Sequence, residues 1–197
     1  MEPPGGMSAR RSRNPARCVT LGLLALVLPG CIAADRDPPS GQPSFYNSMA
    51  NSVAKLDAHA AQSMISGYRR NNGLGAVTLD PTLMRMAEEQ ARAMAARNKM
   101  EHDVAGSFHQ RISSSGYAAG VAAENIGAGY HTLAEAFSGW RDSPGHRANM
   151  LKNGVTHIGI AAVYAPQSKY KVFWALVLAA PESPRPKPTA SWPRTSG

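Results

Sequence analysis

Residues 123–151 of this chain read AENIGAGYHTLAEAFSGWRDSPGHRANML, and this stretch decides the fold. Thr132 and Glu135 have the spacing of a capping box, in which each side chain bonds the backbone N–H of the other residue at a helix start. Beyond Thr132, apolar residues fall at i, i+3, i+4 and i+7, namely Leu133, Ala136, Phe137 and Trp140. This pattern predicts an amphipathic helix with one face on a hydrophobic core.

Side chains that could take part in binding or catalysis lie on both sides of this predicted helix. Glu124 stands next to Asn125, ahead of a Gly-rich turn. His146 lies in the run SPGHRAN, residues 143–149, where proline and glycine suit the start of a second helical segment. We therefore expect a carboxylate and an imidazole to be presented from two different loops.

The fragments AENIG (123–127), Trp140 and SPGHRANML (143–151) together resemble the CAP superfamily, also called SCP, in its bacterial Ser-Pro-Gly-His form. Each fragment is short, so the resemblance rests on their order and spacing. It covers roughly residues 49–180. It implies a three-layer α-β-α sandwich, a single domain of the α/β class.

Three more helices are predicted before this stretch. Apolar residues repeat at helical spacing over residues 49–71. A second helix starts at Asp80, a good N-cap followed by proline, and runs to about Lys99. A short third helix opens at a capping box beginning with Ser107 and ends near Gly116.

Two strands are predicted after it. Residues 158–164 have apolar residues at alternate positions, and residues 170–179 are almost continuously apolar. A run that is apolar on both faces is typical of a strand buried between two layers. The short connection 165–169 makes the two strands a hairpin, and helices around a covered sheet again predict an α-β-α sandwich.

The ends of the chain differ from its middle. Four arginines precede a short apolar run, which predicts a secretory signal over residues 1–30. That run ends in LPGC, which resembles a bacterial lipobox and implies lipidation of Cys31; ordinary cleavage after Ala33 or Ala34 is the alternative. Residues 31–48 then form a flexible tether, residues 49–180 the domain, and residues 181–197 a Pro-rich disordered tail.

Charge and cysteine content limit the kinds of partner and the covalent links that we expect. The formal net charge is +8, of which about +5 remains beyond the signal. No basic stripe interleaved with aromatic residues is present, so a nucleic-acid partner is not expected. Cys18 leaves with the signal, so no disulfide is expected in the domain. We expect a monomer, exported to the bacterial envelope on its periplasmic or outer side and bound to a membrane through Cys31.

The resemblance also suggests a functional cleft. Family members share two histidines and two acidic residues there, and three of these match His102, Glu124 and His146. The second carboxylate is missing, because Ser143 stands at its position. Glu135 belongs to the capping box, and Asp142 faces about a third of a turn away. Supporting contacts are expected from Asn125, Trp140, Ser143 and Asn149.

Several functions remain open for these residues. Two imidazoles and one carboxylate suit a zinc-type site, so His102 and His146 are possible ligands of zinc, magnesium or calcium. A hydrogen-bonded cluster that only holds loops together is the alternative. The favoured function is a binding module for a lipid, a glycan or a divalent cation. One alternative function is a metal-assisted hydrolase of peptide or cell-wall material, with Glu124 as ligand or general base. Another is an inert structural envelope domain.

Overall fold

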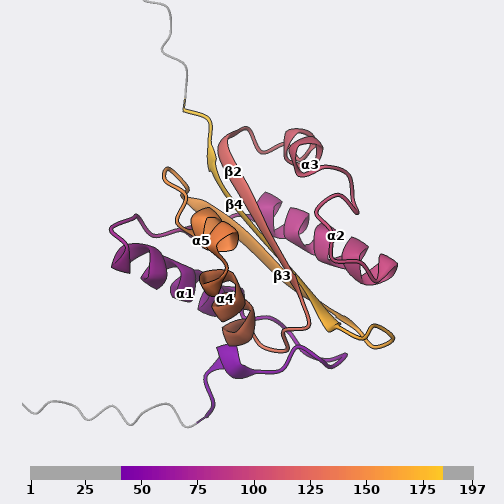
Figure 1. Ribbon diagram of the computed structural model, residues 1–197. Coiled ribbons are helices and arrows are strands. Elements are labelled where there is room, and N and C mark those ends of the chain that lie inside the picture. Colours follow the sequence, from indigo (N-terminus) through magenta and orange to yellow (C-terminus); the bar gives the residue numbers. More distant parts are fainter. Residues whose placement is uncertain (1–40, 184–197) are drawn as a thin grey trace, which may run out of the picture. The chain divides into compact units, whose positions relative to one another are not determined.

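A computed structural model describes residues 41–183 of the chain. Its centre is one four-stranded sheet in the order β1-β3-β4-β2 (Figure 1). Strand β1 (Thr78–Leu79) runs parallel to β3 (His157–Ala165), while β4 (Lys171–Pro181) is antiparallel to both β3 and β2 (Ala119–Ala128). The predicted hairpin of the last two strands is confirmed.

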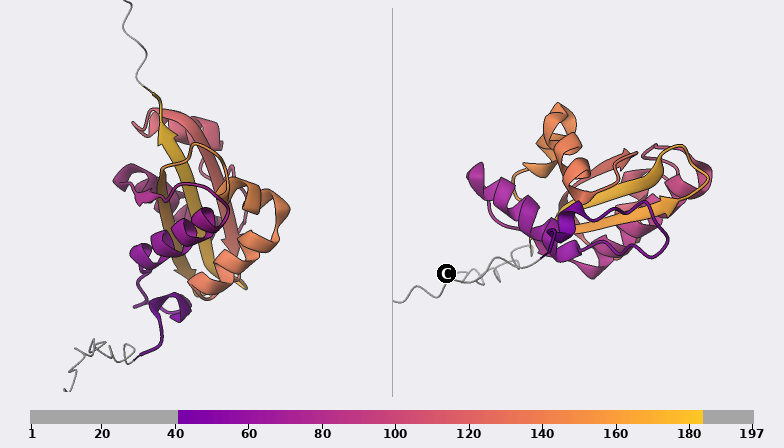
Figure 2. Two further views of the ribbon diagram at one scale, coloured as in Figure 1. Left: turned by 90° about the vertical axis from the view of Figure 1, so that its left-hand side faces the viewer. Right: turned by 90° about the horizontal axis from the view of Figure 1, so that it is seen from below.

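Helices cover both faces of this sheet, as the views in Figure 2 show. One core lies between the sheet and three helices, α1 (Ala58–Asn71), α4 (Leu133–Asp142) and α5 (Pro144–Met150). A second core lies on the other face, under α2 (Pro81–Arg97) and α3 (Phe108–Ser114). The predicted α-β-α sandwich is therefore confirmed.

Strand β4 divides the two cores. Its side chains from Val172 to Ala179 are fully buried, as the apolar run predicted. Trp174, Leu176 and Leu178 belong to one core, and their neighbours Phe173, Ala175 and Val177 belong to the other. A central strand packed on both faces explains why the sequence shows no polar alternation there.

Helix α2 has the predicted boundaries and packs closely on β3. Asp80 accepts hydrogen bonds from the backbone N–H of Thr82 and Leu83, and the helix ends at Asn98 in the left-handed conformation (φ 49°). Where α2 crosses β3, a Cβ on Gly159 would overlap the backbone carbonyl of Leu83. Only glycine permits this approach.

The first predicted helix begins later than expected, at Ala58 rather than near residue 49. Asp57 accepts a hydrogen bond from the Ala60 N–H and caps the helix start. Upstream, the Asn51 side chain bonds backbone groups on both sides of it, which competes with helix formation. Val53, expected on the apolar helix face, is accordingly 84% exposed.

Strand β2 was not predicted, and the expectation that Glu124 lies on a loop is wrong. Glu124 pairs with Val177 in the middle of the β2–β4 ladder. The sequence of β2, AGVAAENIGA, is rich in alanine and glycine, which have low strand propensity. Its pairing with the apolar strand β4 decides its conformation. His146 likewise lies within helix α5 rather than on a loop.

Part of the predicted tether belongs to the folded domain. Ser44–Tyr46 forms a 3-10 turn, and the Ser44 hydroxyl donates a hydrogen bond to Asp57 at 2.7 Å. The Phe45 ring packs against the core that contains α1. The predicted signal, Cys31 and the tail from residue 184 onward lie outside the described residues. Between residues 41 and 183, no helix has both the length and the apolar character needed to span a bilayer.

Candidate functional site

The site is built around a carboxylate on the edge strand of the sheet. Glu124 projects from β2, and its side chain is only 2% exposed. The Arg111 Nη2 group donates to both of its oxygens, at 2.9 and 2.7 Å. His102 Nδ1 lies 2.7 Å from Glu124 Oε1, which makes a third short contact with the same carboxylate. The negative charge of Glu124 is thus matched inside the protein.

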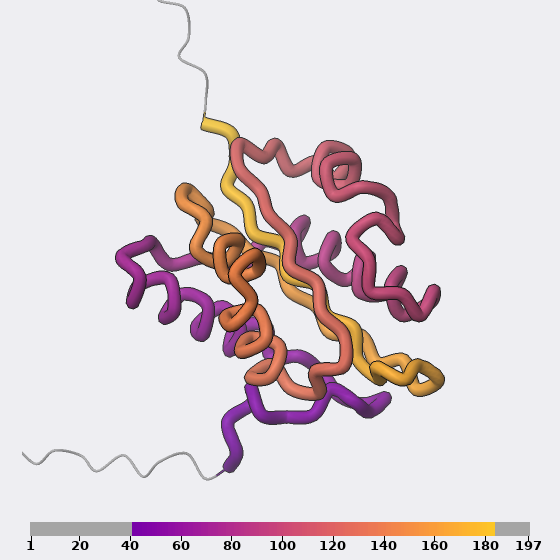
Figure 3. Tube along the Cα trace, viewed as in Figure 1, coloured from indigo at the N-terminus to yellow at the C-terminus, as the bar shows by residue number. Residues whose placement is uncertain are grey.

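Arg111 also fastens the loop that carries His102. Arg111 belongs to helix α3. This helix directly precedes β2 along the chain, whose course can be followed in Figure 3. Besides Glu124, the Arg111 guanidinium donates to the backbone carbonyls of Gly106 and His102. From helix α2, the buried Gln90 amide donates to the carbonyls of Glu101 and His102. These bonds hold the His102 backbone between two helices.

The hydrogen bonds that Arg111 and Gln90 make to the His102 loop leave two buried polar atoms without a partner in the described part of the chain. They are Gln90 Oε1 and Arg111 Nη1, on side chains that share the His102 carbonyl as an acceptor. An unpaired buried polar atom costs free energy, so the loop position is maintained against a local penalty.

The imidazole of His102 is held through one nitrogen and open on its other side. Its side chain is 48% exposed, and Nδ1 is the atom that contacts Glu124. Nε2 therefore remains for a ligand. The hydrogen bond with the Glu124 carboxylate raises the pKa of His102 above its ordinary value, against the opposing effects of partial burial and of Arg111.

Helix α5, which carries His146, is bonded to β2 through the His146 backbone carbonyl and an asparagine side chain. Asn125 Nδ2 donates to the His146 carbonyl at 3.0 Å. Asn149 Nδ2, one turn along α5, donates to Asn125 Oδ1 and to the Glu124 carbonyl. Two asparagines thus tie helix α5 to the strand that carries Glu124.

Trp140 also bonds strand β2, and Ser143 lies at the junction of helices α4 and α5. Trp140 Nε1 donates to the Ile126 carbonyl at 3.0 Å. The carbonyls of Glu124 and Ile126, at alternate positions of the edge strand, are therefore both bonded by side chains from α4 and α5. Ser143 is the last residue before α5 and the first after α4, so it sets the angle between the two helices.

The two imidazoles influence each other. His146 is half-buried, and this burial lowers its pKa below the ordinary value; the nearby His102 lowers it further. Near neutral pH, His102 is thus the more readily protonated ring and His146 the neutral one. A protonated histidine ring donates at both nitrogens, whereas a neutral ring donates at one nitrogen and accepts at the other.

These residues do not fit a metal ion. Arg111 and His102 make three contacts with the two oxygens of Glu124, out of about four lone-pair sites, so little of this carboxylate is left for a metal. The fixed positive charge of Arg111 would also repel a cation at this position. Over residues 41–183, no three His, Cys, Asp or Glu side chains are grouped closely enough to hold an ion.

Neither Glu135 nor Asp142 takes the place of the missing second carboxylate. Glu135 accepts from the backbone N–H groups of His131 and Thr132, which confirms the predicted capping box. Asp142 is exposed and pairs with Arg141. The additional charged partner of Glu124 is a base, Arg111, which the sequence analysis did not identify.

The three-layer sandwich is a CAP-type fold, and comparison with known proteins agrees. A model of the cysteine-rich secretory protein family, CAP, matches residues 62–178. The chain belongs to this family. It is also 29% identical over 138 residues to the uncharacterized protein YkwD of Bacillus subtilis, a match covering 66% of this chain. The match covers 54% of YkwD, so the chain spans about half the length of that relative.

Solved structures share the fold at low sequence identity. An outer surface protein of Borrelia burgdorferi has a TM-score of 0.59 at 20% identity, covering 65% of this chain and 95% of that one. An extracellular protein with an SCP domain from Bacillus anthracis has a TM-score of 0.54 at 23% identity, covering 61% of this chain and 39% of that one.

Proposed function

We propose that this chain is an exported CAP-domain protein, tethered to the bacterial envelope through Cys31, which binds a small ligand at His102 and His146. The LPGC sequence supports the tether. Export is supported by the apolar signal-like segment and by two structural relatives, one of which is an outer surface protein and the other an extracellular protein. The ligand class follows from the charges at the site.

One observation carries the proposal: Arg111 neutralises the buried Glu124, so the half-exposed imidazoles are the groups that face a ligand. A protonated His102 beside a neutral His146 attracts an oxygen acceptor that carries negative charge. The ligand is therefore a molecule with a carboxylate or phosphate group, as found on acidic glycans and lipid headgroups. A divalent cation, the third ligand considered from the sequence, is disfavoured by Arg111.

The same geometry argues against the hydrolase. A general base needs a carboxylate that is free to accept a proton from water, but Glu124 is buried and already accepts from two side chains. Glu124 and Arg111 instead fix the His102 loop. The site thus combines the structural cluster considered from the sequence with two imidazoles that remain available for binding.

Thermal unfolding of the purified protein tests this function. Glucuronate and inorganic phosphate serve as the carboxylate and phosphate probes, and glucose is the uncharged control. A ligand at about 100 times its dissociation constant raises the free energy of unfolding by about 2.7 kcal/mol. We expect a saturable rise in melting temperature with at least one of the anions and none with glucose.

Variants assign that rise to the site. His102→Ala and His146→Ala should each abolish it, whereas His109→Ala, which removes an exposed histidine on α3, should retain it. An equal response in all three variants would mean that the anion binds elsewhere and would overturn the proposal.

A further inference from the structure

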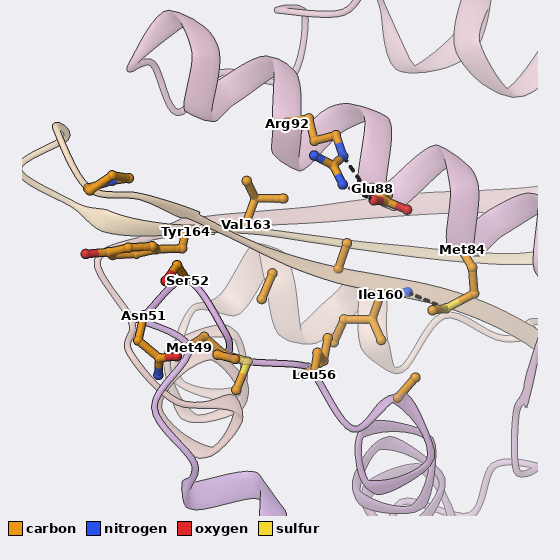
Figure 4. A pocket seen from close by; sticks show the side chains of 15 residues that line it. Met49, Asn51, Ser52, Leu56, Met84, Glu88, Arg92, Ile160, Val163 and Tyr164 are labelled. Carbon is orange, nitrogen blue, oxygen red and sulfur yellow. Dashed lines mark hydrogen bonds and ion pairs between the residues drawn. The ribbon is translucent and has the colours of Figure 1, made fainter.

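The outer edge of β3 is open over more than half of its length. Strand β1 pairs only with His157 and Ile158, and no other described strand lies on that side of the sheet. From Ile160 onward, the β3 edge faces a groove of about 510 Å³ (Figure 4). The groove lies on the opposite edge of the sheet from β2, which carries Glu124.

Backbone groups of β3 point into this groove. The N–H of Asp80 bonds the outward carbonyl of Ile158, and the N–H of Ile160 contacts only the Met84 sulfur, at 3.3 Å, a weak acceptor. In an antiparallel ladder, outward and inward residues alternate. The N–H and C=O groups of Ala162 and Tyr164 therefore point outward as well.

The sequence of the edge itself carries none of the residues that commonly block an open strand. Natural edge strands are commonly blocked by lysine, proline or a bulge. The sequence from 160 to 165 is IAAVYA, without a charge, and Pro166 comes only after the strand has ended. The β3–β4 ladder is regular throughout this stretch. The edge is thus a continuous, uncharged row of backbone donors and acceptors.

The walls of the groove select a narrow, uncharged occupant. On one side stand Met84, Glu88 and Arg92 of α2, and on the other Met49 and Leu56 from the segment before α1 (Figure 4). Glu88 and Arg92 neutralise each other as an i,i+4 ion pair. The side walls are therefore apolar or charge-balanced, and they favour apolar side chains on the occupant.

We propose that this groove binds an extended segment of another polypeptide, which adds to the sheet as a strand beside residues 160–164 of β3. The bound segment would lie on the same side of β3 as β1, directly beyond the residues that β1 pairs with. About five residues suffice, because a strand advances about 3.3 Å per residue. Main-chain bonds to Ile160, Ala162 and Tyr164 give the affinity, and the apolar walls select alternate side chains.

A second copy of this chain is a poor occupant. Paired strands must approach within about 4.8 Å. Ile160 is only 1% exposed, and the β3 edge lies between α2 and the segment before α1. Two edges recessed in this way cannot meet, whereas a single extended peptide can enter.

The test uses the purified full chain and a labelled octapeptide that alternates valine and threonine between terminal lysines. Fluorescence anisotropy measures binding, and hydrogen exchange followed by NMR locates it. We expect saturable binding and slower exchange at the amides of Ala162 and Tyr164. Exchange at Ala161 and Val163, whose amides already bond β4, should not change.

Two controls separate strand pairing from simple apolar binding. The same peptide with every backbone amide N-methylated cannot donate to β3, and it should bind at least about tenfold more weakly, since each lost hydrogen bond weakens binding severalfold. In the protein, Ala162→Pro removes an outward N–H that β4 does not use. Its melting temperature should be retained and its affinity for the unmethylated peptide should fall about tenfold.

Three results would overturn the proposal. They are equal binding of the methylated peptide, absence of saturable binding up to the solubility limit of the parent peptide, and self-association of the chain that protects Ala162 without peptide. If Ala162→Pro fails to fold, the comparison of the two peptides on the wild-type chain decides alone.

Discussion

Arg111 and Glu124 are joined through both carboxylate oxygens, at 2.9 and 2.7 Å, although one lies on a helix and the other on the edge strand of the sheet. This pair keeps the Glu124 carboxylate buried and hydrogen-bonded inside the protein. Under the proposed function, it leaves His102 and His146 as the groups that bind the ligand. Substitutions at this pair, at the two imidazoles and in the packing of α2 have distinct expected effects.

Replacing Arg111 should destabilise the fold strongly. Arg111→Met leaves the Glu124 carboxylate buried without its cation, and loss of one partner from a buried ion pair costs about 3 kcal/mol of unfolding free energy. Urea denaturation measures the loss. The double variant with Glu124→Gln should recover part of it, because the unpaired charge is then gone.

An exposed ion pair provides the matched control for Arg111. Arg92 bonds Glu88 on the surface of α2, with side chains 67% and 52% exposed. Arg92→Met should cost less than about 1 kcal/mol. Similar losses in the Arg111 and Arg92 variants would show that the Arg111–Glu124 pair is not buried as described.

The stabilising effect of His102 should depend on pH. Because Glu124 raises the pKa of His102 in the folded state, its contribution is complete below the unfolded value, about 6.5, and is lost as pH rises through the folded value. The difference in unfolding free energy between the wild type and His102→Gln should therefore shrink as pH rises above about 6.5. A difference that grows with pH would contradict the assigned contact.

The pKa of His146 should respond to a change at His102. Removing the neighbouring positive charge in His102→Gln should raise the pKa of His146, although burial, the larger cause, keeps it below its ordinary value. An NMR titration of the imidazole protons measures both effects. His109→Gln is the control. An unchanged His146 titration in His102→Gln would mean that the two rings are too far apart to form one site.

Gly159→Ala should be strongly destabilising. The added Cβ would overlap the Leu83 carbonyl, where backbone from α2 lies against β3 and neither side can move easily. We expect a loss of about 3 kcal/mol, at the upper end for overpacking. Gly67→Ala is the control, because its Cβ would meet nothing in the middle of α1, and it should raise stability by about 0.5–1 kcal/mol. Equal effects of the two substitutions would disprove the close contact.

Local signals predicted most of the helices but not the whole sheet. Asp80 and the capping boxes at Ser107 and Thr132 mark helix starts within a few residues, so those starts were predicted correctly. Strand β2 carries no such signal, because its alanines and glycines gain strand conformation only by pairing with β4. The start of α1 depended on Asp57, whose capping role competes with an apolar pattern extending past it.

Some residues of the candidate site could be proposed from the sequence, and one could not. Glu124 and His146 stand in fragments whose order resembles a family, and His102 matches a family position, so all three could be proposed without a structure. Arg111 stands in no such fragment. Its role comes from the path of the chain, which brings α3 against the middle of β2, and no spacing between Arg111 and Glu124 encodes that contact.

The central claim is that the imidazoles bind an anionic group while Arg111 excludes a metal, and NMR of the imidazole signals tests it most directly. Glucuronate, inorganic phosphate, glucose and zinc are titrated separately into the wild-type protein. The account predicts saturable shifts of both His102 and His146 with at least one anion, stronger at about pH 6 than at about pH 8, and none with glucose. Saturable zinc binding that shifts both signals, with no response to either anion, would contradict it.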